Sequence, residues 1–143
     1  MTAIHRAPVV TFLTLAIVAM IASVGLSQTS QSKSASIERG KYIVEDVAHC
    51  ELCHTPRNEQ GQPDRGRWLM GGPLQIQATY PNRWAATTPR LAGHPPGTDA
   101  EVVRLLTTGI WKTGMPPNPP MAQYHMTPAD AEAVVAYLKS LTP

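Results

Sequence analysis

The sequence has little cysteine, little net charge and no alternating strand pattern, and each shortage excludes a class of protein. Only two cysteines are present, so there is no thiol for a framework of several disulfides or for a zinc site with paired cysteines at both ends. The formal net charge is +2, which gives no argument for nucleic-acid binding. No segment alternates apolar and polar residues convincingly, so helices and loops are expected throughout.

Both cysteines fall in one pentad, Cys50-Glu51-Leu52-Cys53-His54, and its spacing predicts covalent attachment of haem. Two thiols three positions apart can each add across a vinyl group of one porphyrin. The histidine after the second cysteine then lies under the iron and can ligate it through a ring nitrogen. We therefore expect Cys50 and Cys53 to tether haem c, and His54 to be an axial iron ligand.

Two other interpretations of the pentad stay open on its own evidence. A C-x-x-C pair also occurs in thioredoxin-like redox proteins and as half of a zinc site. A redox pair normally begins a helix in a βαβ pattern, and no strand-rich segment surrounds this one. A zinc site needs four ligands, and the remaining candidates, His49, His94 and His125, are scattered without paired spacing. Features elsewhere in the chain are needed to choose among the haem, dithiol and zinc interpretations.

The N-terminus supports the haem interpretation, because residues 1–26 have the pattern of a signal peptide or membrane anchor and haem is attached after export in bacteria. Arg6 precedes an uncharged, mostly apolar run over residues 7–26. This run approaches the ~20 residues that span a bilayer as a helix, which favours an uncleaved anchor, although Ser23-Val24-Gly25 offers small residues for cleavage. Arg6 favours a cytoplasmic N-terminus. We expect the rest on the periplasmic side of the inner membrane, anchored there, or soluble in the periplasm after cleavage.

The next segment, residues 27–35, is rich in Ser and Gln with a single charge at Lys33, which predicts a flexible linker. The folded domain is then residues 36–143, which is barely large enough to bury a core without help. A covalently held porphyrin would supply a large apolar centre. Fourteen prolines in the chain imply long loops between few regular elements.

Three helices are predicted in this domain, over residues 36–49, 98–108 and 128–141, so the expected fold class is all-α with long loops. Gly40 interrupts the first helix, which indicates close contact with another backbone. Capping residues mark the ends of these helices. They are Ser36, Thr98 with Glu101, Gly109, and Thr127 followed by Pro128.

The loop between the second and third predicted helices, residues 109–126, contains Met115, Met121 and Met126 among four prolines. A methionine in a hydrophobic core usually just fills space. A methionine in an irregular loop is harder to explain by packing alone. Because prolines preset the backbone, they would hold a thioether in place over one face of a haem.

With these motifs in place, the chain resembles a mono-haem class I cytochrome c over nearly all of residues 37–142. The resemblance implies three main helices with long loops around one covalently bound haem. It also implies that the first and last helices cross closely at Gly40, with Val44 against Tyr137 or Leu138. The stretches that carry the resemblance are ERGKY at 38–42 with CELCHTPR at 50–57, PPMAQYHMT at 119–127, and AVVAYLKSL at 133–141.

The resemblance further implies a methionine as the second axial ligand, followed within several residues by the cap of the last helix. Met121 lies six residues before Thr127 and fits this rule. Met115 lies twelve residues before it and is the runner-up, while Met126 adjoins the cap and is expected to pack. The family often has proline directly after the ligand, where Ala122 stands here, so the loop is expected to be less stiff.

Other side chains are expected around the haem or its ligands. Arginine forks and an indole N–H suit the haem propionates, although the alternative of solvated loop residues, with Trp84 packing on the macrocycle, stays open. Pro73 or a nearby residue is expected to offer the carbonyl that accepts the hydrogen bond from the other ring nitrogen of His54. His94 and His125 are expected at the surface. The propionate candidates are Arg57, Arg83, Trp84 and Arg90.

With both axial positions filled by His54 and Met121, the iron has no open position for a substrate, so we expect a one-electron carrier or relay subunit and not an enzyme. The alternative is a haem-based enzyme or small-ligand sensor with a labile distal position. The expected partners are a dehydrogenase donor and an oxidase or cytochrome acceptor. A modest basic bias indicates that a partner docks with an acidic face. The residues of this bias are Arg57, Arg65, Arg67, Arg83 and Arg90.

Overall fold

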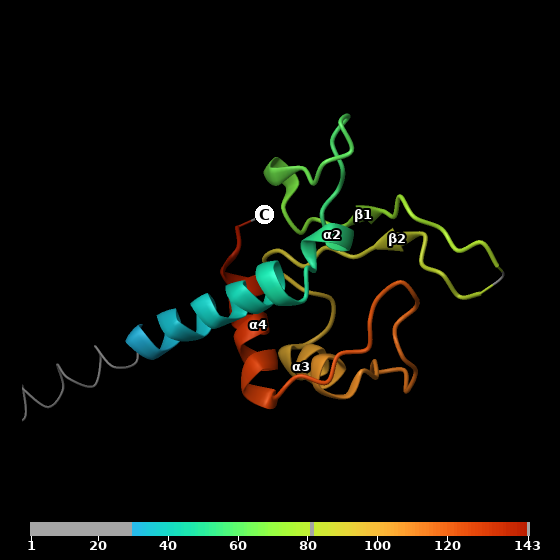
Figure 1. Cartoon of the computed structure of the whole chain (residues 1–143). Helices are drawn as coiled ribbons and strands as arrows, with labels where there is room; N and C mark the ends of the chain where they lie inside the picture. The colour runs from blue at the N-terminus through green and yellow to red at the C-terminus, as the bar shows by residue number, and fades with distance from the viewer. Residues whose placement is uncertain (1–29, 81, 143) are drawn as a thin grey trace, which may run out of the picture. The chain divides into compact units, whose positions relative to one another are not determined.

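The computed structural model describes residues 30–80 and 82–142. The predicted signal or anchor at residues 1–26, and the first three residues of the predicted linker, lie outside the described residues. Internal contacts divide the chain into Met1–Ala35 and Ser36–Pro143, and the elements labelled in Figure 1 belong to the second unit. Within the described ranges, no helix combines the length and the apolar character needed to cross a bilayer.

The first helix begins earlier than the sequence predicted and ends differently. Residues 30–42 are α-helical, so the described part of the predicted flexible linker, residues 30–35, consists of exposed helical turns. Once a helix is nucleated, adding residues costs little, and Ser and Gln are not strong helix breakers. The helix then winds into a π-helical turn, η1, Ile43–Val47, instead of continuing as α-helix to His49.

This π-turn places the pentad in a separate short helix. The backbone N–H of Cys50 donates to the carbonyl of Val44 across the turn (3.0 Å). His49 takes a φ of 48°, in the left-handed region that few residues other than glycine adopt, so the chain turns sharply there. The pentad then forms α2, Glu51–His54, with Cys50 at its N-cap.

Helices α3 and α4 begin and end close to the positions that their caps predicted. Helix α3, Asp99–Thr108, starts with the expected capping box and ends at Gly109, which has a φ of 70°. Helix α4, Pro128–Ser140, starts after Thr127, whose hydroxyl accepts a backbone N–H of the first turn. Such caps satisfy backbone groups that have no partner inside the helix. Local sequence is therefore sufficient to position both helices.

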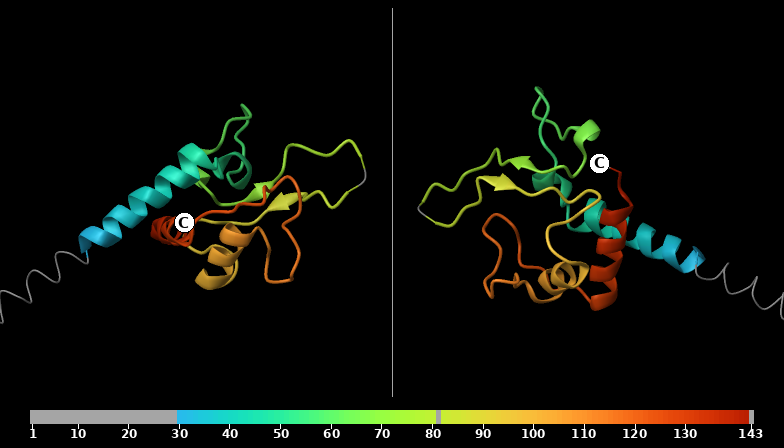
Figure 2. Two further views of the ribbon diagram at one scale, coloured as in Figure 1. Left: turned by 60° about the horizontal axis from the view of Figure 1, so that its bottom comes forward. Right: turned by 180° about the vertical axis from the view of Figure 1, so that it is seen from behind.

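The first helix crosses α4 at Gly40, as predicted, and the crossing is visible in the right-hand view of Figure 2. A Cβ atom at Gly40 would lie 1.9 Å from the carbonyl oxygen of Ala133 and 2.8 Å from the Cβ of Tyr137. The Tyr137 hydroxyl also donates to the carboxylate of Glu45, in the π-turn. The buried core around this crossing consists of Ile43, Val44, Leu69, Ala92, Val102, Leu106, Ala131, Val134, Val135, Tyr137 and Leu138.

The segment between α2 and α3 contains a small sheet, which corrects the expectation of an all-α fold to a mainly helical one. After the 3₁₀ turn η2, Arg65–Arg67, the strands β1, Gly72–Pro73, and β2, Thr87–Thr88, pair antiparallel. Strands of two residues are too short to show alternation in the sequence. Between them, residues 74–80 and 82–86 belong to an extended arm that projects from the helices (Figures 1 and 2).

Candidate functional site

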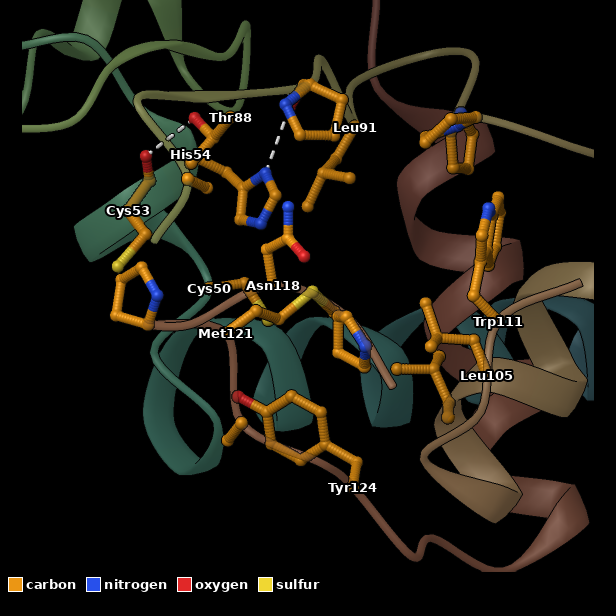
Figure 3. Close-up of a pocket in the computed structure, with 18 of the residues that line it drawn as sticks. Cys50, Cys53, His54, Thr88, Leu91, Leu105, Trp111, Asn118, Met121 and Tyr124 are labelled. Carbon is orange, nitrogen blue, oxygen red and sulfur yellow. Dashed lines mark hydrogen bonds between the residues drawn. The ribbon is translucent and has the colours of Figure 1, made fainter. Parts of the chain in front are cut away.

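The pentad opens onto a cavity of about 590 Å³, drawn in Figure 3. The pentad forms one wall, the arm and β2 a second wall, and the loop at residues 109–126 a third. Apolar residues of α3 and α4, including Leu105, Val134 and Leu138, complete the lining. A mostly apolar cavity of this size, with a few polar groups converging on it, is typical of a small-molecule or cofactor site.

His54 is held with one ring nitrogen directed into this cavity. The imidazole is buried, with 7% of the residue exposed, and its Nδ1 lies 2.9 Å from the carbonyl oxygen of Pro89. Burial lowers the pKa of His54, against the opposing effect of that hydrogen bond. The neutral ring therefore donates through Nδ1–H, and the Nε2 lone pair points into the cavity (Figure 3). The expected acceptor near Pro73 is thus corrected to Pro89.

Two more hydrogen bonds fix α2 against the small sheet. The Thr88 hydroxyl donates to the carbonyl of Cys53 at 2.9 Å, and the N–H of Gly71 donates to the carbonyl of His54 at 2.7 Å. The last carbonyls of a short helix have no partner within it. These contacts supply partners from a distant segment, and so they orient the pentad toward the cavity.

The two cysteines are free, and the environment of Cys50 does not suit a redox-active dithiol. Burial, followed by the neighbouring Glu51 carboxylate, raises the pKa of Cys50 to about 12. Reactive thiols of disulfide oxidoreductases instead have a lowered pKa. Among the described residues, no group of three or more His, Cys, Asp or Glu side chains gathers as a metal site would require. The dithiol and zinc interpretations therefore find no support in the geometry.

The three loop methionines occupy different environments. Met121 is partly buried, lines the cavity and directs its thioether toward the space in front of His54 (Figure 3). Met115 also lines the cavity, but 51% of it is exposed and its Sδ lies 3.6 Å from Nη1 of Arg83. Met126 packs against the core. Its environment agrees with the packing role expected from its position beside the cap.

The structure brings only one of the expected propionate contacts to the cavity. Arg83 lines it. Arg57 does not, and its Nη2 donates to the carbonyl of Leu52 at 2.8 Å. The indole N–H of Trp84, also outside the lining, donates to the carbonyl of Ile76 at 2.9 Å. Arg90, His94 and His125 are exposed, and none of them lines the cavity.

Sequence reasoning missed several residues of the cavity wall. Trp111, Asn118 and Tyr124 all line it and come from the same loop as Met121 (Figure 3). The Tyr124 hydroxyl donates to the carbonyl of Ala48 at 3.2 Å, and burial raises its pKa to about 12. This bond ties the loop to the end of the first helix. Their position in the same loop as Met121 was the available signal for these residues.

A covalently attached haem fits this donor set. Two thiols at the required spacing border an apolar cavity, a neutral imidazole nitrogen faces into it, and a thioether from another segment faces the same space. Residues 37–142 match the family described as Cytochrome c. The chain belongs to the cytochrome c family. Its spacing and fold place it with the class I c-type cytochromes, and this membership implies a covalent haem c and a role in electron transfer.

Curated relatives of this cytochrome share its sequence over a part of their own length. A "Diheme cytochrome c-type" protein of Cereibacter sphaeroides is 35% identical over 108 residues, 71% of this chain and 34% of the relative. The "Fructose dehydrogenase cytochrome subunit" of Gluconobacter japonicus is 30% identical over 112 residues, 72% of this chain and 21% of the relative. A nicotinate dehydrogenase subunit of Pseudomonas putida is 31% identical over 125 residues, 82% of this chain and 10% of the relative. The chain thus spans about a third or less of each.

Proposed function

We propose that this domain carries single electrons on one haem c, attached through Cys50 and Cys53 and ligated axially by His54 and Met121. The observation that carries the proposal is the convergence of these four side chains on one apolar cavity. The first helix, α3 and α4 would surround the macrocycle. When bound, the haem supplies a one-electron Fe(III)/Fe(II) couple.

Met121 is the better candidate for the distal ligand. The Met121 side chain is less exposed to solvent than that of Met115. The loop is also held in place two residues before Met121, because the carbonyl of Pro119 accepts the N–H of Ala85 at 2.7 Å. The Met115 sulfur lies against the Arg83 guanidinium, and half of that methionine faces solvent. Binding through Met115 would require the loss of this contact and a shift of the loop.

The protein's contribution to electron transfer is to keep the iron environment unchanged. The Pro89 carbonyl fixes the orientation of His54, so its Nε2 stays directed at the same point. The apolar walls exclude water and disfavour the added charge of the ferric state. Disfavouring the ferric state raises the reduction potential, and a thioether ligand would raise it further. With His54 and Met121 both bound, the iron would have no open position for a substrate, which supports a carrier or relay over a catalyst.

The partners that we propose are a dehydrogenase as electron donor and an oxidase or another cytochrome as acceptor. Two relatives named as subunits of dehydrogenases support the donor. The apolar run over residues 7–26 supports export, with the domain on the periplasmic side of the bacterial inner membrane. We propose that this segment stays as the anchor, with a soluble periplasmic form after cleavage as the alternative.

The ligand assignment can be tested with the variants Met121→Leu and Met115→Leu, a matched pair in one loop. We expect Met121→Leu to abolish the far-red absorption band of a ferric His/Met haem and to lower the potential, whereas Met115→Leu keeps both. Loss of the band in Met115→Leu alone would reverse the assignment. Wild-type protein that binds carbon monoxide rapidly would instead favour the sensor or enzyme with a labile distal position.

The attachment can be tested on a denaturing gel stained for haem. Wild-type protein, matured in a host that attaches haem to exported proteins, should retain the stain after denaturation. The variant C50S/C53S should lose it, because no thioether then holds the porphyrin. A wild-type chain that never stains would overturn the proposed function as a whole.

A further inference from the structure

Three large hydrophobic side chains are exposed on the arm and the loop beside it. The exposed fractions are 53% for Ile76, 67% for Tyr80 and 51% for Met115. Exposed apolar residues that occur singly need no explanation, but gathered ones mark interaction sites. Ile76 and Tyr80 lie on the arm, which borders the cavity through its two ends.

Direct contacts join the arm to the loop that carries Met115. Arg83 contacts the Met115 sulfur at 3.6 Å, and the N–H of Ala85 donates to the Pro119 carbonyl at 2.7 Å. The arm therefore does not hang free of the distal loop. Both segments contribute residues to the cavity lining, and we call residues 74–80, 82–86 and Met115 together the arm surface.

The arm surface carries one charged side chain, Arg83, and no acidic residue. The sequence has no Asp or Glu between Asp64 and Asp99, a stretch that contains four arginines. Arg83 pairs with no carboxylate in the part of the chain that the structure describes, and contacts the Met115 thioether instead. A surface with exposed apolar groups and uncompensated positive charge is complementary to an apolar, acidic surface.

Three of the other four predicted basic residues are already engaged, and the fourth, the exposed Arg90, lies outside the arm surface. Arg67 forms an ion pair with Asp64 at 2.7 Å, and the Arg65 guanidinium lies 4.2 Å from the centre of the Trp68 ring. Arg57 donates to backbone carbonyls. The loop at residues 57–67 thus has its charge partly neutralised and held in place, which leaves the arm surface as the better docking candidate.

We propose that the arm surface docks an acidic electron-transfer protein, with Ile76, Tyr80 and Met115 as apolar contacts and Arg83 as its charge. This inference rests on the proposed function and adds the place and chemistry of the partner contact. A partner on the arm surface sits at the rim of the cavity, so docking there brings its redox centre close to the haem. Small, charge-steered interfaces suit the brief encounters of redox proteins.

The test uses the full haem-loaded chain and reduced flavodoxin, a small acidic flavoprotein, as electron donor. The variant Gln77→Glu adds a negative charge to an exposed position of the arm, and Gln60→Glu adds the same charge to the exposed loop at residues 57–67. Stopped-flow mixing should show Gln77→Glu reduced several-fold more slowly than wild type at low salt. The difference should shrink as salt screens the charge, while Gln60→Glu stays near wild type.

The apolar part is tested by I76S/Y80S against Val47→Ser, which alters a side chain that is 56% exposed in the π-turn. The double variant should react several-fold more slowly at all salt concentrations, and Val47→Ser should not. Equal slowing by Gln60→Glu and Gln77→Glu, or no slowing by any arm variant, would overturn the docking proposal alone. A wild-type haem that dithionite cannot reduce, or that cannot be reoxidised, would instead refute the proposed electron carrier.

Discussion

The close helix crossing at Gly40 makes Gly40→Ala an informative perturbation. Helix propensity alone would make alanine more stable than glycine by about 0.5–1 kcal/mol. The new Cβ, however, would lie 1.9 Å from the Ala133 carbonyl oxygen, where contacts under 3.0 Å essentially never occur. The helices must therefore separate by roughly 1 Å, and overpacking of this kind costs about 1–3 kcal/mol. The two ranges together allow a net loss of up to about 2.5 kcal/mol of unfolding free energy, and because the clash is with backbone atoms that cannot rotate away, we expect about 1–2 kcal/mol.

The assay is denaturant unfolding of the haem-loaded protein, followed by far-ultraviolet circular dichroism and by the haem absorption. A loss of that size corresponds to a fall in Tm of roughly 4–8 °C per kcal/mol for a domain near 100 residues. The matched control is Gly66→Ala, where a Cβ would meet only the carboxylate oxygen of Asp64 at 3.3 Å. Gly40→Ala protein as stable as wild type, or more stable, would refute the argument from close backbone approach.

Three further predictions concern the stability of the domain. Thr98→Ala removes the cap of α3 and should lower the unfolding free energy by about 1 kcal/mol, measured in the same assay. Leu69→Ala truncates a fully buried side chain and should lower the unfolding free energy by about 2–5 kcal/mol. A smaller loss would mean that neighbouring side chains relax into the space left by the leucine. The hydrogen bond from Arg39 lowers the pKa of Asp130, so its stabilising effect is present at neutral pH and is lost on acidification. Asp130→Asn should be less stable than wild type at pH 7, and the two unfolding curves should converge below the ordinary pKa of 3.8.

Helix ends were predictable where the capping residues lie within a few positions of the helix end in the sequence. The capping box at Thr98 and the Thr127 cap each satisfy backbone groups within a few residues of themselves, so spacing alone locates them. The π-turn before the pentad was not predictable, because it depends on His49 adopting a left-handed φ within the folded structure. The two-residue strands were missed for a similar reason, since pairing across the base of the arm has no local signal.

Some residues of the candidate site could also be predicted from the sequence, and others could not. The pentad and Met121 could be chosen from spacing and from the resemblance to a family. The acceptor for His54 could not, because Pro89 lies 35 residues away and only the folded chain brings it to the ring. Arg57 and Trp84 have the right chemistry for propionates, but nearby carbonyls compete for their N–H groups. Residue type alone cannot show which acceptor a donor finds.

The Pro89 carbonyl has a consequence for how the potential of this protein can vary. The acceptor for the His54 ring is a main-chain oxygen, so replacing the side chain at position 89 leaves the acceptor atom in place. A carboxylate in that role would carry a full negative charge, would draw the imidazole toward imidazolate and would favour the ferric state. Substitutions that change the reduction potential are therefore expected on the Met121 side of the cavity and in the cavity wall. With His54 as the proposed iron ligand, the acceptor of its ring N–H is set by the path of the backbone, so a change of side chain at position 89 does not by itself remove that acceptor.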